Sequence, residues 1–377
     1  EHGFADGKHE RYEERLVLAA DLWNETRLQA PETRRLLTQL SLGLGLSYWK
    51  MYCPSELVPP TPLTSAEADA WNTIYRDALG EFFFRNQLDP YARQPFVGTE
   101  TTHAPPSRTT TSPLAIVPFG GGKDSLLTLH LLQTREIPCR AFTLGTSIVQ
   151  EQGLRAFQTP VDTITRTLDA EMIRKSKAGE AYNGHVSITL IYALTASLVA
   201  LLRDARYVVF SNESSASEAN IEWRGMAINH QWSKSWEAEQ LIRSLIETSV
   251  APDLSVFSLL RPLTEVGIVE RVARLLPHLF GSFSSCNKNF TIASARPHRK
   301  DAAYWCGTCP KCAFVGLLFA PFISRAALER LIGSNPLNNP DLIPLYRDLL
   351  GLGSLKPFEC VGTFEETRAC FAALAHH

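Results

Sequence analysis

Three consecutive glycines precede a lysine, an aspartate and a serine in the first half of the chain. With the aromatic residue before them, these residues are Phe119, Gly120, Gly121, Gly122, Lys123, Asp124 and Ser125. The apolar run at 114–119 predicts a buried strand before this loop, and residues 124–133 predict a helix after it. Glycine lets backbone amides approach an anion closely, and a helix N-terminus favours negative charge. The loop is therefore predicted to bind phosphate groups.

The loop departs from the Walker motif, in which Gly and four further residues precede Gly-Lys and a Ser or Thr. Val117 stands at the first glycine position, and Asp124 follows Lys123. The string resembles instead the SGGxDS signature of the PP-loop ATP pyrophosphatases, with Gly120 in place of the usual serine. That resemblance implies that the loop holds the pyrophosphate of ATP, with Asp124 near magnesium, Ser125 donating to phosphate and Lys123 stabilising charge. The alternative is an ordinary glycine turn in which Asp124 caps the helix.

A second polar segment, at 211–239, contains three tryptophans, which indicate that it is folded. Ser211, Asn212 and Glu213 follow a predicted strand at 207–210, so they are expected beside the glycine loop and are assigned to nucleotide binding. Further polar residues are candidates for substrate recognition: Arg224, Asn229, His230, Gln231, Ser233, Lys234 and Arg261. The alternative for each is a solvated helix face, or a structural ion pair for the arginines.

Three cysteines, Cys306, Cys309 and Cys312, are separated from one another by two residues. This spacing lets thiolates converge on one tetrahedral ion, and Cys286 is the candidate for a fourth ligand. A structural zinc ion is predicted. The alternatives are reduced core thiols, or two thiols that act as acid and base.

Predicted strands at 114–119, 139–144 and 207–210 alternate with predicted helices at 124–133 and 183–204. Such alternation predicts an α/β fold with a parallel sheet and helices on both faces. The resemblance of the glycine loop implies that this fold is of the PP-loop type. We divide the chain into a mainly helical N-terminal domain with a linker (1–110), a PP-loop ATP-binding domain (111–285) and a cysteine-rich, helical C-terminal region (286–377).

The composition restricts the function classes. The 377 residues, 45% of them hydrophobic, suffice for two or three domains. Lys plus Arg (37) nearly balances Asp plus Glu (39), so no nucleic-acid partner is expected. The uncharged run at 186–202 is short and contains hydroxyl side chains, which favours a buried helix over a membrane span. The clustering of three of the eight cysteines and the absence of a secretory signal pattern favour the cytoplasm.

Several short strings occur in an order that is similar to one family, the UDP-N-acetylmuramoyl-L-alanyl-L-glutamate epimerases, usually called MurL. The strings lie at 120–125, 183–185, 211–213, 229–235, 260–263, 285–287, 305–307 and 357–362, with 45–48 and 79–86 in the N-terminal region. Each string is weak alone, but together they cover nearly the whole chain.

The family resemblance implies an enzyme of bacterial cell-wall synthesis that converts the terminal L-glutamate of a UDP-muramoyl dipeptide to D-glutamate. It implies that ATP and Mg²⁺ are used and that AMP and pyrophosphate are released. The α-proton beside an ionised carboxylate is very weakly acidic, and an acyl-adenylate would remove that charge. The implied partners are therefore the UDP-muramoyl dipeptide and ATP.

Epimerisation needs a base on one face of the α-carbon and an acid on the other. His230, Lys234, Cys286 and Cys360 are candidates, because imidazole, a desolvated amine and a thiol can each exchange protons near neutral pH. Asp124 joins the catalytic set through magnesium. The sequence leaves the choice among these groups open.

Two other functions compete with the epimerase. One is a PP-loop synthase that acts on a purine precursor or tRNA and carries a structural zinc ion, which the cysteine cluster would supply. The other is a nucleotide-binding module without turnover, which the change to Gly120 allows but the intact Lys123, Asp124 and Ser125 disfavour.

Overall fold

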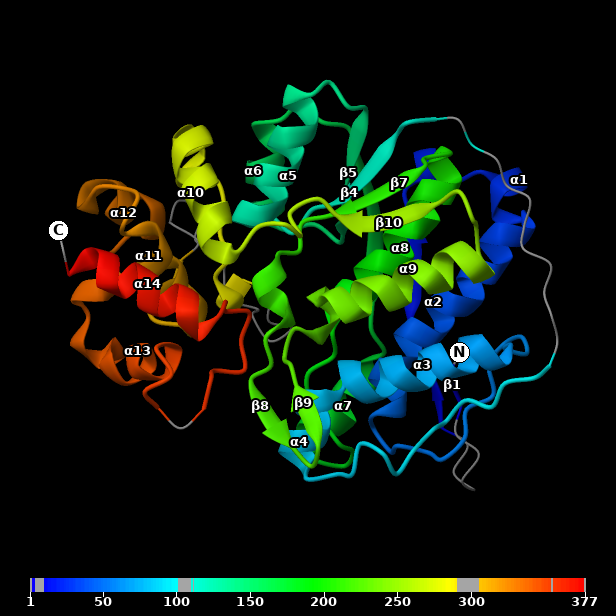
Figure 1. Cartoon of the computed structure of the whole chain (residues 1–377). Coiled ribbons are helices and arrows are strands. Elements are labelled where there is room, and N and C mark those ends of the chain that lie inside the picture. The colour runs from blue at the N-terminus through cyan, green and yellow to red at the C-terminus, as the bar shows by residue number, and fades with distance from the viewer. Residues whose placement is uncertain are drawn as a thin grey trace.

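The centre of the molecule is a six-stranded sheet in the order β10-β7-β4-β5-β6-β3 (Figure 1). The structure is a computed structural model that describes residues 2–3, 10–100, 110, 112–289, 305–353 and 355–375. Five strands are parallel, and β3 pairs antiparallel with β6. The strands are β3 Arg15–Leu18, β4 Ala115–Pro118, β5 Cys139–Leu144, β6 Val161–Thr167, β7 Tyr207–Phe210 and β10 Ser255–Ser258. The predicted α/β fold is confirmed.

Helices connect the parallel strands. They are α5 Lys123–Thr134, α6 Ile148–Arg155, α7 Ala170–Ala178, α8 Ile188–Arg203 and α9 Trp236–Ser249. The predicted strands at 139–144 and 207–210 have these bounds in the structure. The long helix begins at Ile188 rather than at residue 183, because Asn183 Oδ1 and Gly184 O each accept a hydrogen bond from Lys50 Nζ, both at 3.1 Å. Residues 183–187 therefore form a structured loop.

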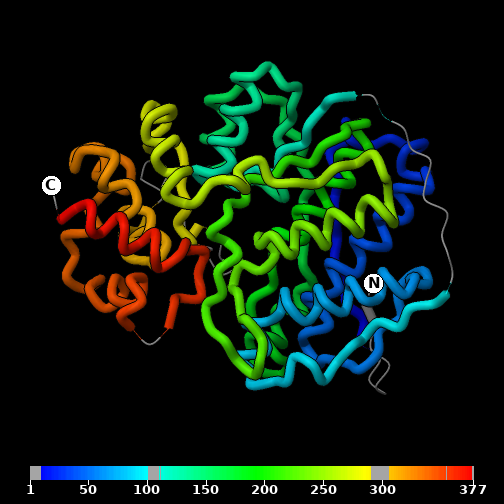
Figure 2. Tube along the Cα trace, in the orientation of Figure 1, coloured from blue at the N-terminus to red at the C-terminus, as the bar shows by residue number. Residues whose placement is uncertain are grey.

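Two hydrophobic clusters cover the two faces of the sheet. Figure 2 traces the path of the chain through the sheet and its helices. Ile116 and Val208 belong to the cluster that contains α8, whereas Val117 and Val209 belong to the cluster that contains α5. Successive side chains of a strand point to opposite faces, so neighbouring residues enter different layers. Strands buried on both faces read as continuous apolar runs, which is why these strands were predictable from sequence.

The N-terminal region shares the core of the sheet. Its helices are α1 Glu25–Leu28, α2 Pro31–Trp49, α3 Ser65–Ala78 and α4 Gly80–Asn86, and residues of α2, α3 and α4 join α8 in one hydrophobic cluster. The strand β3 extends the sheet at its β6 edge, where Leu18 pairs with Ile164. The predicted division at residue 110 stays a prediction, but the N-terminal helices and the sheet are built on one continuous core.

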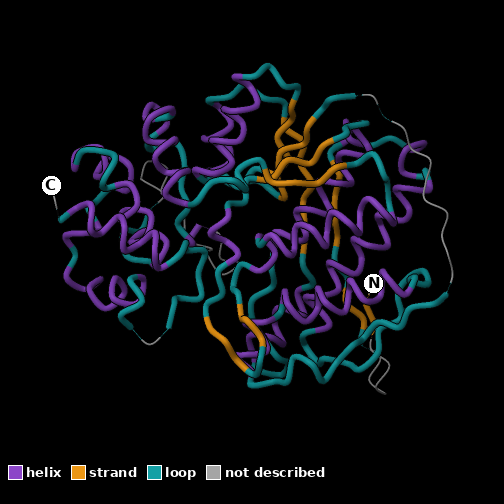
Figure 3. The backbone as a smooth tube through the Cα atoms, in the orientation of Figure 1, coloured by secondary structure: helices purple, strands orange, loops and turns teal. Residues whose placement is uncertain are grey.

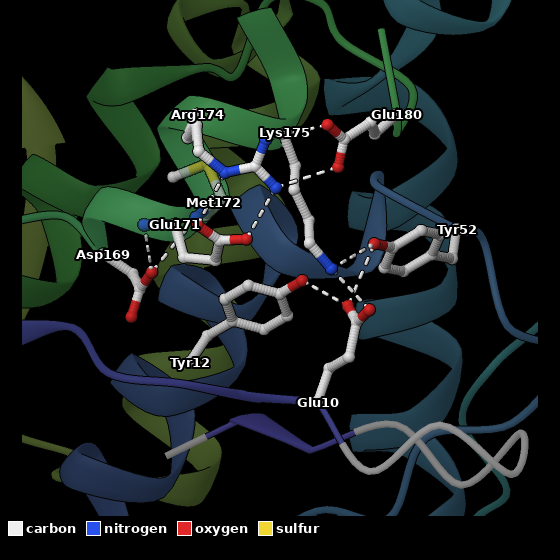
Figure 4. Close-up of polar contacts among 9 residues, drawn as sticks. All are labelled: Glu10, Tyr12, Tyr52, Asp169, Glu171, Met172, Arg174, Lys175 and Glu180. Atoms are coloured by element: carbon white, nitrogen blue, oxygen red, sulfur yellow. Dashed lines mark hydrogen bonds and ion pairs between the residues drawn. The ribbon is translucent and has the colours of Figure 1, made fainter. Parts of the chain in front are cut away.

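A polar cluster holds residues 10–13 against α7 (Figure 4). The carboxylate of Glu10 accepts hydrogen bonds from Lys175 and from the hydroxyl of Tyr52, the latter at 2.9 Å. The backbone amide of Glu13 donates to Asp169 Oδ2 at 2.9 Å, and Asp169 also caps α7. Two short strands, β1 His2–Gly3 and β2 Arg11–Tyr12, form a separate antiparallel pair.

The C-terminal region packs helices against the second cluster, at one side of the sheet (Figure 3). These helices are α10 Glu265–Leu275, α11 Pro310–Phe319, α12 Arg325–Ile332, α13 Ile343–Leu349 and α14 Phe364–Leu374. A small hairpin, β8 Ile221–Trp223 and β9 Met226–Ile228, precedes the segment that carries His230. In the described part of the chain, every helix is too short or too polar to cross a lipid bilayer.

Candidate functional site

A pocket of ≈ 250 Å³ lies beyond the carboxyl ends of β4 and β7. In the sheet, β4 lies between β5 and β7. After β4 the chain forms β5 and β6 on one side of it and then crosses to form β7 on the other side. Ligands bind open α/β sheets at such a reversal of strand order. Side chains and backbone from distant segments line the pocket: Pro118, Gly120, Gly122, Asp124, Ser125, Ile188, Thr189, Tyr192, Phe210, Ser211, Asn212, Glu213, Lys234, Ser284, Ser285, Asn287, Lys311 and Cys360.

The glycine loop forms one wall and requires its glycines. Gly121 has φ +83°, and a Cβ atom there would lie 2.8 Å from Val149 Cγ1. A Cβ atom on Gly120 would meet no described residue within 4 Å. Gly122 is the N-cap of α5, and no side chain in the described part of the chain caps that helix. Amides of the first turn of α5 are therefore available to an anion in the pocket.

Lys123 and Asp124 diverge at the start of α5. Asp124 lines the pocket, whereas the side chain of Lys123 is fully buried and forms ion pairs with Asp124 and Glu265. Burial alone would lower the pKa of Lys123, but the carboxylates of Asp124, Glu265 and Glu213 raise it. Lys123 thus carries a fixed positive charge beneath the loop, and its role as a direct phosphate ligand stays a prediction.

The opposite wall follows β7 and carries a carboxyl group with an unusual pKa. Burial, together with the nearby charges of Glu265 and Asp124, raises the pKa of Glu213 to about 7 against the opposing effect of nearby lysines. A divalent cation between Asp124 and Glu213 would relieve this repulsion. Ser211 Oγ is buried and has no hydrogen-bond partner among the residues that the structure describes, so a ligand oxygen could satisfy it.

Two charged residues, one that lines the pocket and one beside it, were not among the candidates from the sequence. Lys311, on α11, lines the pocket; its Nζ lies 3.2 Å from Glu265 Oε1 and donates a hydrogen bond to Cys360 O. Glu265, at the start of α10, therefore accepts from both Lys123 and Lys311, and these two cations hold its pKa at about 2 against the effect of burial. The sequence of the glycine loop does not indicate that Lys311 or Glu265 would lie near it.

Three of the predicted proton-transfer residues gather at the far end of the pocket. Lys234 and Cys360 both line it, and the thiol of Cys360 lies within hydrogen-bonding reach of His230. Burial opposes ionisation of Cys360, but Lys234 and His230 lower its pKa to about 6. The charge of Cys360 in turn raises the pKa of Lys234.

Cys286 lies instead with the other thiols of the predicted metal set. Sγ of Cys286 is 3.8 Å from that of Cys309, the Cys306 and Cys312 sulfurs are 3.7 Å apart, and the Cys309 and Cys312 sulfurs are 3.4 Å apart. All four lie within 4.8 Å of one another. A tetrahedron of Zn–S bonds of about 2.3 Å separates its sulfurs by about 3.8 Å, so the four thiols fit a zinc ion.

Most other candidates for substrate recognition have structural partners. Arg261 donates to Glu213 O at 2.7 Å, Lys234 O at 2.8 Å and Glu239 Oε2 at 2.6 Å, which joins the segments that carry the pocket. Asn229 Nδ2 donates to Ala216 O at 2.8 Å. These contacts indicate that both residues position the pocket walls rather than contact a ligand.

The remaining candidates lie away from the pocket lining. Arg224 is exposed in the β8–β9 turn, where its guanidinium lies 4.6 Å from the centroid of the Trp223 ring. Phe119 is a core residue, and Ser233 is buried. Gln231 Nε2 donates to Val361 O at 3.0 Å, which fixes the chain next to Cys360.

Together, the fold and the pocket define an α/β protein with a glycine loop, a carboxylate pair and a thiol at the reversal of strand order. A family model described as the MurL N-terminal domain matches residues 2–259, and one described as the MurL C-terminal domain matches residues 282–377. The chain belongs to the MurL family.

Curated relatives match across most of this chain, and each carries the name UDP-N-acetyl-alpha-D-muramoyl-L-alanyl-L-glutamate epimerase. The protein of Xanthomonas oryzae pv. oryzae is 36% identical over 349 residues, 92% of this chain and 76% of the relative. The proteins of Salinispora tropica and a Micromonospora species are each 36% identical over 345 residues, 90% of this chain and 73% and 75% of those relatives.

Proposed function

We propose that this protein epimerises the terminal L-glutamate of UDP-N-acetylmuramoyl-L-alanyl-L-glutamate to D-glutamate, in the assembly of peptidoglycan precursors. The names of relatives 36% identical over about nine-tenths of the chain support the substrate. One observation of the structure carries the mechanism: a single pocket is lined both by the glycine loop and by Cys360. Activation of a carboxylate and proton exchange beside it would then occur in one place.

ATP is the proposed second substrate, and its phosphates are proposed to lie along the glycine loop. Among the described residues, the backbone at Gly120 is open, the start of α5 has no side-chain cap and the Ser211 hydroxyl has no partner, and these features support this placement. Asp124 and Glu213 would hold Mg²⁺, which suits oxygen ligands and would neutralise charge on the departing pyrophosphate. Lys311 adds a positive charge on the other side of the pocket.

Adenylation explains why a nucleotide is needed for an epimerisation. An oxygen of the glutamate α-carboxylate attacks the α-phosphorus of ATP, the bond to the bridging oxygen breaks, and pyrophosphate leaves. The resulting acyl-adenylate has no carboxylate charge, so its α-proton is more acidic and the electrons of the C–H bond can move onto the carbonyl oxygen. Proton return on the opposite face gives the D-centre, and water then releases AMP.

A structural zinc ion is a further part of the proposal. Cys286, Cys306, Cys309 and Cys312 would hold it, because their sulfurs already have tetrahedral spacing. Cys286 follows Ser284 and Ser285, which line the pocket, and Cys309 and Cys312 flank Lys311, which lines it from the other side. The ion would fasten these two walls together and would take no part in the reaction itself.

Incubation of the pure protein with ATP, Mg²⁺ and UDP-N-acetylmuramoyl-L-alanyl-L-glutamate tests the proposed function. The expected result is pyrophosphate release that depends on this substrate, with D-glutamate in the acid hydrolysate. Pyrophosphate release only with tRNA or with a purine-like acid would favour a PP-loop synthase instead. Nucleotide binding without turnover under every condition would make the chain a binding module.

A further inference from the structure

We propose that Cys360, His230 and Glu81 form a proton-exchanging triad in which the Cys360 thiolate removes the α-proton of the activated glutamate. This inference rests on the proposed function and deepens it, because it chooses one base among several candidates and adds Glu81. The three residues come from three distant segments: α4, the loop after β9, and the loop before α14. Only Cys360 touches the pocket, so His230 and Glu81 are positioning residues.

The carboxylate and the imidazole form a fixed pair. Glu81 Oε2 lies 2.5 Å from His230 Nδ1, and the exposed fractions of the two side chains are only 7% and 13%. Glu81 Oε1 also accepts from Arg85 Nε at 2.5 Å, which keeps the carboxylate oriented. With Nδ1 occupied, the other ring nitrogen of His230 is left for a second partner, and the Cys360 thiol lies within reach of the ring.

Neighbouring contacts hold the imidazole and the thiol in place. The ring of His185 packs against that of His230, with centroids 4.2 Å apart. The loop that carries His185 is in turn fixed by Lys50, whose Nζ donates to Asn183 Oδ1 and Gly184 O. On the other side, Lys311 donates to the carbonyl oxygen of Cys360. Cys360 therefore lies on a braced backbone at the lining of the pocket.

The charges around the triad favour a thiolate and an imidazolium. Burial raises the pKa of Cys360, but the charges of Lys234, His230 and Lys311 lower it to about 6. Burial lowers the pKa of His230, but Cys360 and Glu81 raise it to about 9. A nucleophile or base oriented by an imidazole, which is itself oriented by a carboxylate, is the general arrangement of an activated thiol.

Two neighbouring groups do not compete for this role. Burial and the adjacent charge of His230 lower the pKa of His185 to about 4, so its ring is neutral near pH 7. Burial raises the pKa of Glu359 to about 7, and the Glu359 carboxylate accepts from Asn287 Nδ2. Neither residue lines the pocket, and Cys286 lies in the thiol cluster.

The step is a proton transfer without a change of oxidation state. The sulfur of Cys360 takes the α-proton and becomes a thiol, and the C–H electron pair moves into the enolate of the acyl-adenylate. The ammonium group of Lys234, which also lines the pocket, returns a proton to the opposite face of the carbon. Exchange of the Cys360 thiol and of the lysine with solvent then restores both groups.

Cys360→Ala, assayed in deuterated water, separates this inference from the proposed function. We expect pyrophosphate release within several-fold of the unmodified protein, while deuterium incorporation at the glutamate α-carbon falls at least about 100-fold, the usual scale of general-base catalysis. The matched control is Cys139→Ala, a partly buried cysteine at the start of β5 outside the pocket lining, which should leave both rates unchanged.

The two proposals fail in different ways. If the unmodified protein releases no pyrophosphate with the dipeptide substrate, the proposed function is wrong. If folded Cys360→Ala protein exchanges deuterium normally, the triad is wrong while the function stands. Loss of pyrophosphate release together with exchange would place Cys360 in activation and would also overturn the triad.

Alkylation tests the positioning residues without substrate turnover. We expect iodoacetamide to modify Cys360 with a half-maximal rate near pH 6, measured on the Cys360 peptide by mass spectrometry. Glu81→Gln removes the charge that stabilises the imidazolium, so the midpoint should rise by about one pH unit. An unchanged midpoint in Glu81→Gln would show that Glu81 is merely structural.

A bound cation is the rival explanation for this cluster, because Glu81, His185 and His230 offer ligand atoms within 4.8 Å of one another. Metal analysis of the purified protein distinguishes the two. The triad predicts the same metal content before and after His230→Ala. A full equivalent of metal lost on that substitution would make the cluster a metal site and overturn the triad.

Discussion

Lys311 Nζ, on α11, lies 3.2 Å from Glu265 Oε1, on α10, directly beside the pocket. The same carboxylate pairs with Lys123 at the start of α5. One buried glutamate therefore joins the glycine loop to the C-terminal helices, and the pocket depends on both halves of the chain.

Glu265→Gln should destabilise the protein, because two buried ammonium groups would lose their shared countercharge. Removing one partner of a buried ion pair is expected to lower the free energy of unfolding by about 3 kcal/mol. Chemical denaturation would measure this change. The control is Glu329→Gln, which removes an exposed ion pair with Arg325 at 3.0 Å. Its free energy of unfolding should change by less than about 1 kcal/mol. Equal effects for the two variants would contradict the proposed role of Glu265.

Asp124→Ala should abolish pyrophosphate release and epimerisation together. The substitution removes a carboxylate from the pocket wall where Mg²⁺ is proposed to bind, and loss of such a group is expected to raise the barrier by about 3 kcal/mol or more. A pyrophosphate assay and chiral analysis of the glutamate would check it. Retained turnover would remove Asp124 from the mechanism.

Gly121→Ala should weaken nucleotide binding more than a substitution that introduces backbone strain alone. At φ +83° a side chain is strained by about 1–3 kcal/mol, and its Cβ would also press on Val149 Cγ1 at 2.8 Å. Gly179→Ala is the control, because its φ of +73° is similar and its Cβ would meet none of the residues that the structure describes within 4 Å. Calorimetric titration with ATP and Mg²⁺ should show a loss of affinity in the first variant only.

Proton exchange should be bell-shaped in pH. The Cys360 thiolate is lost as the pH falls through its pKa of about 6, and the His230 imidazolium that orients this thiolate is lost as the pH rises through its pKa of about 9. Lys234 stays charged across this range, because the charge of Cys360 raises its pKa. Initial rates of deuterium incorporation from pH 5 to 10 would reveal the two limbs. A rate that rises steadily through pH 9 would contradict the assignment.

Removal of zinc by a chelator should weaken ATP binding, although the proposed zinc site is separate from the pocket. Removal of zinc from Cys286, Cys306, Cys309 and Cys312 would free the two walls that carry Ser285 and Lys311, so the midpoint of thermal unfolding should fall and ATP affinity should be lost. The purified protein is expected to contain one equivalent of zinc, and Cys309→Ser to contain less than one-tenth of that. A protein that is free of metal but fully active would refute the site.

The sequence predicted the elements whose signals are local. The strand at 139–144 was predictable because its consecutive residues are mostly apolar. The glycine loop was predictable because the residues that form its turn are adjacent in the sequence. Lys123, in contrast, was predicted to stabilise charge, but its ion pair with Glu265, 142 positions away, could not be predicted from the sequence. Pairings over such separations depend on the packing of whole helices, which one sequence does not reveal.

The same reason accounts for the residues that the sequence left undecided. Cys286, Cys360 and His230 all carry suitable chemistry, and only the fold separates a thiol in a four-sulfur cluster from one in the pocket. Glu81 gave no signal, because its partner His230 lies 149 positions away. The strands β3 and β6 were not predicted, because neither is buried on both faces as the recognised inner strands are.

Transfer of carboxylate oxygen to AMP tests the central claim most directly. The substrate would carry 18O in the α-carboxylate of its terminal glutamate, and the AMP formed would be analysed by mass spectrometry and phosphorus NMR. Formation and hydrolysis of an acyl-adenylate predict one 18O atom in the phosphate of each AMP molecule, together with D-glutamate. AMP without 18O, or D-glutamate formed without AMP, would contradict activation of the carboxylate in this pocket.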